Sequence, residues 1–172
     1  MEKNTSEEFV ITRLLNAPGD RVWRAWTERE QLMQWFGPKG CTIPVAKMDL
    51  RPGGVFHYAL RTPDGHEMWG KWTFREIDAP KKLVLISTFS DAQGSITRHP
   101  MAADWPLETL STTTLEQQNG KTALTIRWSP WNASAAEIKK FTESHASMQQ
   151  GWGGTFEQLA AYLEKASPQG RI

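Results

Sequence analysis

Six consecutive segments between Cys41 and Trp131 constrain the fold of this chain most strongly, because each is rich in Val, Ile, Thr and aromatic residues. Short turn sequences separate them, namely RPGG, TPDG, DAP and NG, together with one longer stretch at 91–106. Branched and aromatic side chains favour strands, and an Asn-Gly pair between two such segments favours a tight hairpin. The pattern therefore predicts six strands joined as an antiparallel meander.

The residues before this meander predict one further strand and two short helices. Residues 7–15 carry apolar side chains at period two, which is typical of a strand, and the turn NAPGD follows. The apolar spacing of DRVWRAW predicts a helix. The sequence T-x-x-E at Thr27–Glu30 is a capping box, which predicts the start of a second helix that ends before GPKG.

A long terminal helix is predicted after the meander. Ser134 and Glu137 have the spacing of a second capping box, and apolar residues then recur every three or four positions as far as Leu163. The predicted helix has about 30 residues and a length of roughly 45 Å. It is the only predicted element long enough to cover one face of an antiparallel sheet of seven strands.

Three glycines, Gly151, Gly153 and Gly154, lie within one turn of this helix. Each costs about 0.5 to 1 kcal/mol of helix stability relative to Ala. We expect Gly151 and Gly154 to permit close approach of a neighbouring element or to leave cavity volume. Gly153 falls on a different face, and we expect it to be tolerated without a role.

The composition excludes several classes of partner. The 20 Lys and Arg residues nearly balance the 19 Asp and Glu residues without a basic run, so we expect no nucleic acid partner. No apolar run approaches the roughly 20 residues that a membrane span requires. Cys41 is the only cysteine and the N-terminus is polar, so we expect a cytoplasmic protein without a disulfide or a secretory signal.

Five stretches of this chain resemble a known family, namely APGDRVWRAWTEREQLMQWFGPKG, DLRPGGVFHYALRTPDG, MWGKWTFREIDAPKKLVLISTFSD, WPLETLSTTT and SMQQGWGGTFEQLAAYL. They are similar to the bacterial single-domain homologues of the activator of the heat-shock protein 90 ATPase, within the START-like or SRPBCC superfamily. The resemblance implies an α+β helix-grip fold, in which a seven-stranded antiparallel sheet wraps around the long C-terminal helix. We predict one such domain over 1–172, with its core at about 7–165.

The same resemblance implies a cavity between the sheet and the terminal helix, because members of the superfamily bind lipids, polyketides and plant hormones or act as cyclases. We predict that the cavity binds a small lipophilic or aromatic molecule. A dry core filled by large rings would also explain any single aromatic residue. The residues that we expect to line the cavity are Trp35, Phe56, Tyr58, Trp72, Phe89, Trp128, His145, Met148 and Trp152.

His145 is the polar residue on the apolar stripe of the terminal helix. In one interpretation it orients the ligand, with Ser87, Thr112 or Arg127 as its partners or as further pocket groups. In the other it is a core histidine bonded to a buried hydroxyl or carbonyl group.

The stretch 96–108 is predicted to be a loop at the rim of the sheet. An ordinary surface connection would explain it. Its side chains, Arg98, His99, Met101 and Trp105, also suit a lid over a cavity mouth.

Two alternative functions stay open. A cavity enzyme of the cyclase, dehydratase or hydrolase type would use His145, His57 or Glu108 for acid–base chemistry. A chaperone-ATPase-activating interaction module would use an exposed apolar patch. The eukaryotic activators carry an additional N-terminal domain that contacts the chaperone. We therefore favour ligand binding over chaperone contact as the function of this chain. A homodimer also stays open.

The sequence predicts neither a metal site nor a cofactor. The four histidines are dispersed, without H-x-x-x-H, C-x-x-C or H-E-x-x-H spacing. A G-x-S-x-G nucleophile motif is absent. RPGG and GWGG do not occupy the strand-to-helix turn that a phosphate loop requires.

Overall fold

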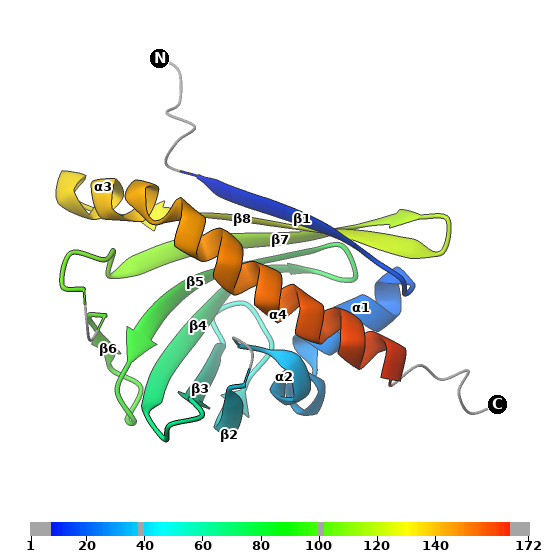
Figure 1. Ribbon diagram of the computed structural model, residues 1–172, viewed down its shortest axis with the longest axis horizontal. Coiled ribbons are helices and arrows are strands. Elements are labelled where there is room, and N and C mark those ends of the chain that lie inside the picture. Colours follow the sequence, from blue (N-terminus) through cyan, green and yellow to red (C-terminus); the bar gives the residue numbers. More distant parts are fainter. Residues whose placement is uncertain (1–7, 38–39, 100–101, 166–172) are drawn as a thin grey trace, which may run out of the picture.

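A long helix crosses one face of a curved antiparallel sheet in the computed structural model of this protein (Figure 1). The structure describes residues 8–37, 40–99 and 102–165. Its elements are β1 (Phe9–Leu15), α1 (Gly19–Thr27), α2 (Arg29–Trp35), β2 (Thr42–Met48), β3 (Val55–Arg61), β4 (Glu67–Asp78), β5 (Lys82–Ser90), β6 (Ile96–Thr97), β7 (Glu108–Gln118), β8 (Lys121–Trp131), α3 (Ala135–Glu143) and α4 (His145–Lys165).

The sheet has the strand order β1-β8-β7-β5-β4-β3-β2, and every pairing is antiparallel. The first strand, β1, therefore lies beside the last one, β8, whereas β2, the first strand of the meander, forms the opposite edge of the sheet. The predicted α+β helix-grip architecture is confirmed. The additional strand is β6, which pairs with β5 through two residues only, too few for strand propensity to reveal.

Alternation along the strands divides the sheet into a covered face and an outer face. On β8, Thr122, Leu124 and Ile126 are fully buried, whereas Lys121 and Arg127 are exposed. The covered face meets Phe156 and Leu159 of α4, which are also fully buried. Burial of large apolar side chains between the two layers is the main stabilising contribution, at about 1.5 to 3 kcal/mol each.

Polar bonds fasten the C-terminal half of α4 to the end of α2. The Thr155 hydroxyl donates to the carbonyl oxygen of Gly37 at 3.1 Å. The Gln158 side-chain amide donates to the carbonyl oxygens of Trp35 at 3.0 Å and Gly37 at 2.7 Å. These bonds satisfy carbonyl groups that the end of a helix leaves without partners, and they fix the height of α4 above the sheet.

The predicted long C-terminal helix is confirmed as α4, but its predicted length of about 30 residues is wrong, because the chain forms two helices that meet at Ser144. The Ser144 hydroxyl donates to the carbonyl oxygen of Lys140 at 2.8 Å. Such a bond to the residue four positions earlier competes with the helical pattern and bends helices. The capping box that starts α3 is confirmed, since the Glu137 amide donates to the Ser134 hydroxyl at 3.1 Å and the Ser134 amide donates to the Glu137 carboxylate at 2.9 Å.

The predicted capping box at Thr27–Glu30 is also wrong. Glu28 is the N-cap residue of α2 and makes no side-chain capping bond. Thr27 is still the last residue of α1, and its hydroxyl donates to the carbonyl oxygen of Trp23 at 2.8 Å. The hydroxyl is thus used at the end of one helix and not at the start of the next.

The glycines of α4 do not serve close packing. A Cβ atom at Gly151, Gly153 or Gly154 would meet no atom within 4 Å, so the expectation of close approach at Gly151 or Gly154 is wrong. Gly70 on β4 differs, because a Cβ atom there would overlap the phenol of Tyr58, its partner on β3. The Tyr58 side chain therefore lies across the bare backbone of Gly70.

These two environments predict opposite effects of alanine. Gly153→Ala and Gly154→Ala should each raise the free energy of unfolding by about 0.5 to 1 kcal/mol, because helix propensity improves and no atom is in the way. Gly70→Ala should lower it by about 1 to 3 kcal/mol, because the Tyr58 ring must shift. Urea denaturation measures all three. A neutral or stabilising Gly70→Ala would contradict the packing of Tyr58 on Gly70.

Candidate functional site

A cavity of about 560 Å³ lies between the sheet and the N-terminal half of α4. Its walls come from the covered faces of β3, β4, β5, β7 and β8, from α3 and α4, and from His99, Ala102, Trp105 and Pro106. Ser147 and Gly151 line it and are also exposed to solvent. The cavity therefore reaches the surface beside the first turns of α4.

Aromatic rings form a large part of the cavity wall. Trp152 of α4 is central, since its ring lies 6.2 Å from that of Trp26 in a nearly parallel arrangement and 6.4 Å from that of Trp128 edge-on. Offset-parallel and edge-on pairs are the favoured geometries of aromatic contacts. The lining rings are those of Trp26, Phe36, Tyr58, Trp69, Trp72, Phe89, Trp105, Trp128 and Trp152.

Hydroxyl groups form a polar strip on the sheet side of the cavity. Thr109, Ser111 and Thr113 alternate along β7 and therefore share one face, and Ser87 lies opposite Thr109 on β5. The Thr109 hydroxyl donates to the carbonyl oxygen of Ser87 at 3.2 Å. A ligand with polar substituents would find hydrogen-bond partners along this strip.

Two basic side chains stand at the α3 end of the cavity. Lys140 is the only Lys, Arg, Asp or Glu among the lining residues that the structure describes, and His99 lies near it. Burial lowers the pKa of His99, and the positive charge of Lys140 lowers it further. The His99 ring contacts Phe89, with ring centroids 4.7 Å apart. His99 is therefore predominantly neutral at pH 7.

The described part of the 96–108 loop is attached to α3. Arg98 forms a salt bridge with Glu137, and this pairing holds the pKa of the Glu137 carboxyl below its usual value. The Trp105 ring lies 5.5 Å from that of Phe141. His99 and Trp105 line the cavity, whereas Met101 lies outside the described residues. These described loop residues form one end of the cavity, and the action of the loop as a lid stays a prediction.

Six of the nine side chains expected at the cavity do line it, namely Tyr58, Trp72, Phe89, Trp128, Met148 and Trp152. Trp35 does not, because it is 1% exposed between the two short helices and its indole donates to the carbonyl oxygen of Ala25 at 3.0 Å. Phe56 is fully buried and stacks on Tyr58 at 4.9 Å, so it supports a lining ring without reaching the cavity.

His145 also lies away from the cavity, on the side of α4 that faces β1. Its ring contacts those of Phe9 and Phe141, each at 5.6 Å, and its buried Nε2 atom has no hydrogen-bond partner among the residues that the structure describes. Neither interpretation of His145 describes this position fully. Of the partners considered for it, Ser87 lines the cavity and Arg127 pairs with Glu8 at 3.3 Å.

The other residues proposed for acid–base chemistry are not in the cavity either. His57 is bonded to the carbonyl oxygen of Asp91 at 3.0 Å and its ring lies against Trp69 at 5.0 Å. Glu108 begins β7 opposite Trp131 and does not line the cavity. Within the described ranges, no three His, Cys, Asp or Glu residues are grouped closely enough to hold a metal ion.

Several lining residues were not expected from the sequence, above all Trp26, Phe36, Lys140 and the hydroxyls of β7. The signal for β7 was its alternation of Thr, Ser and Thr at 109, 111 and 113, which places three hydroxyls on one face. The signal for Lys140 was its spacing from Ser144, Ser147 and Gly151, which lie on one stripe in steps of three or four.

Comparison with known proteins places the chain among proteins of the same architecture. The family model described as "Activator of Hsp90 ATPase homolog 1-like protein" matches residues 16–164. A solved protein from Arthrobacter aurescens is 27% identical with a TM-score of 0.76, and the match covers 96% of this chain and 91% of that one. One from Nitrosomonas europaea is 26% identical with a TM-score of 0.75, covering 95% and 97%. No curated protein matches the sequence significantly.

Within residues 8–37, 40–99 and 102–165, no helix combines the length and the apolar character that crossing a bilayer requires.

The electrostatic link between Lys140 and His99 can be tested by substitution. Lys140→Gln removes a positive charge that disfavours protonation, so the pKa of His99 should rise towards its ordinary value. Lys139→Gln removes the neighbouring charge on α3, whose side chain is 74% exposed, and should have a smaller effect. A histidine NMR titration of both variants measures this. An unchanged or lower pKa of His99 in Lys140→Gln would contradict the proximity of the two groups.

Proposed function

We propose, from the premise that this chain belongs to the Activator of Hsp90 ATPase homolog 1-like family, that it binds a small lipophilic or aromatic molecule between its sheet and α4. The cavity itself is the observation that carries the proposal. Small-molecule pockets usually enclose about 300 to 1,000 Å³, and a cavity of about 560 Å³ falls within that range. The fold of this family commonly accommodates hydrophobic ligands, which supports the same conclusion.

The chemistry of the lining supports a ligand that is mainly apolar with a few polar atoms. Indole and phenyl rings offer flat apolar surfaces, on which a planar ligand would stack. Tyr58 adds a polar hydroxyl group among them. A phenol is already protonated at neutral pH, and burial raises the pKa of Tyr58 further. A neutral phenol inside an apolar pocket both donates and accepts hydrogen bonds.

The alternative functions have weaker support. A cavity enzyme based on His145, His57 or Glu108 would need at least one of them in the cavity, and none lines it. A chaperone-binding surface would need a contiguous apolar patch. The exposed large apolar side chains of the described residues are Val10, Leu14, Leu50 and Ile96, which come from β1, β6 and the connection between β2 and β3. A cytoplasmic location remains part of the proposal, and the single cysteine supports it.

The neutral fluorescent probe N-phenyl-1-naphthylamine tests this function. Titration should give saturable binding at one site, accompanied by a change in tryptophan emission, because Trp152 and Trp72 line the cavity. Gly151→Leu should raise the dissociation constant of the probe at least about tenfold, since the new side chain would occupy the mouth of the cavity.

Gly153→Leu is the matched control for this titration. It adds the same side chain to the same helix about 200 degrees away, and Gly153 does not line the cavity. Binding should be retained. Weak, non-saturable binding to the native protein would overturn the proposed function, as would equal affinity of the native protein and the Gly151→Leu variant.

A further inference from the structure

The charge distribution of the cavity narrows the class of ligand. Of its described lining residues, Lys140 alone carries a formal charge at neutral pH, and no carboxylate faces the interior. A cationic ligand would therefore meet one positive charge and no negative one. An anionic ligand would meet a single ammonium group.

The carboxylates near Lys140 on α3 are already engaged with other cations. Glu137 is paired with Arg98 of the cavity-end loop. Glu143 lies 4.0 Å from the ammonium of Lys139 on the outer side of the helix. Lys140 forms no ion pair of its own among residues 8–37, 40–99 and 102–165.

The surroundings of Lys140 favour an anionic partner for its ammonium group. Its side chain is half-buried and borders a cavity whose walls are mainly apolar and rich in aromatic rings. A charge that is partly removed from water is costly unless an opposite charge accompanies it. A bound anion would supply that charge while leaving the rest of the ligand among the rings.

We propose that the ligand of this cavity is an aromatic monocarboxylate, whose ring system lies among the tryptophans and whose carboxylate pairs with Lys140 at the α3 end. This inference rests on the proposed function and adds the chemical class of its ligand. One cation matches one negative charge, which favours a carboxylate over a dianionic phosphate. The aromatic body follows from the rings of Trp105, Trp128 and Trp152 in the cavity wall.

The test uses three probes that share one ring system and differ in charge, namely 1-naphthaleneacetate, 1-naphthaleneethanol and 1-naphthaleneethylamine. Calorimetric titration of the native protein should give binding of the acid about tenfold tighter than that of the alcohol, with the amine weakest. The Lys140→Gln variant should lose this preference and bind the acid about as tightly as the alcohol. Lys140→Arg should restore most of it, because the charge is kept.

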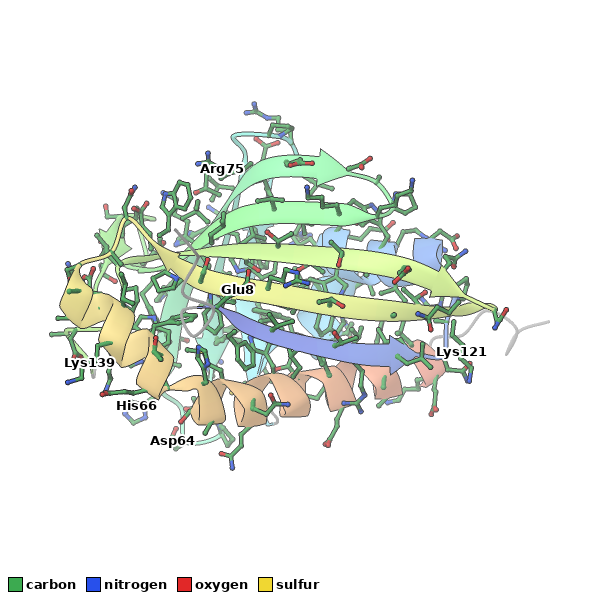
Figure 2. The ribbon with its side chains drawn as sticks, turned by 90° about the horizontal axis from the view of Figure 1, so that it is seen from above. Glu8, Asp64, His66, Arg75, Lys121 and Lys139 are labelled. Carbon is green, nitrogen blue, oxygen red and sulfur yellow. The ribbon has the colours of Figure 1, made fainter. Side chains whose placement is uncertain are left out.

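Lys139→Gln is the matched control. Lys139 is the adjacent residue, with the same charge, on the outer side of α3 (Figure 2), and it does not line the cavity. The preference for the acid should survive this substitution. Thermal unfolding of each variant shows that the fold is retained.

The possible outcomes separate this inference from the proposed function. Equal binding of acid and alcohol by the native protein would overturn the carboxylate inference and leave the cavity as a binding site for neutral ligands. Retention of the acid preference in Lys140→Gln would overturn the role of Lys140. Failure of all three probes to bind saturably would overturn the proposed function as well.

Discussion

The way in which α4 is held above the sheet determines the rest of the structure. Towards its C-terminal end, Thr155 and Gln158 are bonded to the carbonyl groups at the end of α2, and Phe156 and Leu159 are fully buried. One turn earlier, Gly151 contributes no side chain, so the space below α4 is left open. One helix therefore closes the core at one end and covers a cavity at the other.

The strands could be predicted from the sequence because their signals are local. Period-two alternation and turn residues specify β2 to β5, β7 and β8, and the Ser134 capping box specifies the start of α3. The break at Ser144 could not be predicted in the same way. It depends on whether a serine hydroxyl bonds back to the backbone, and the apolar spacing continues through it unchanged.

The cavity residues could be predicted only in part. Periodicity shows which side chains share the buried face of a strand, but not which of them reach the cavity. Phe56 and Tyr58 lie on the same face of β3, yet only Tyr58 reaches the cavity, since Gly70 beside it leaves room for the ring. A lysine on a helix usually indicates a solvated face. Lys140 departs from this rule because α3 ends against the cavity mouth, a property of the tertiary arrangement.

The central claim is that a ligand enters the space between the sheet and α4. The methionine methyl groups report this most directly, because Met68 and Met148 line the cavity whereas Met33 and Met48 pack elsewhere against the core. Methyl NMR of the protein saturated with N-phenyl-1-naphthylamine should show large shifts and probe contacts for Met68 and Met148, with Met33 and Met48 unchanged. Contacts confined to Met33 and Met48, or none at any of the four, would contradict the account.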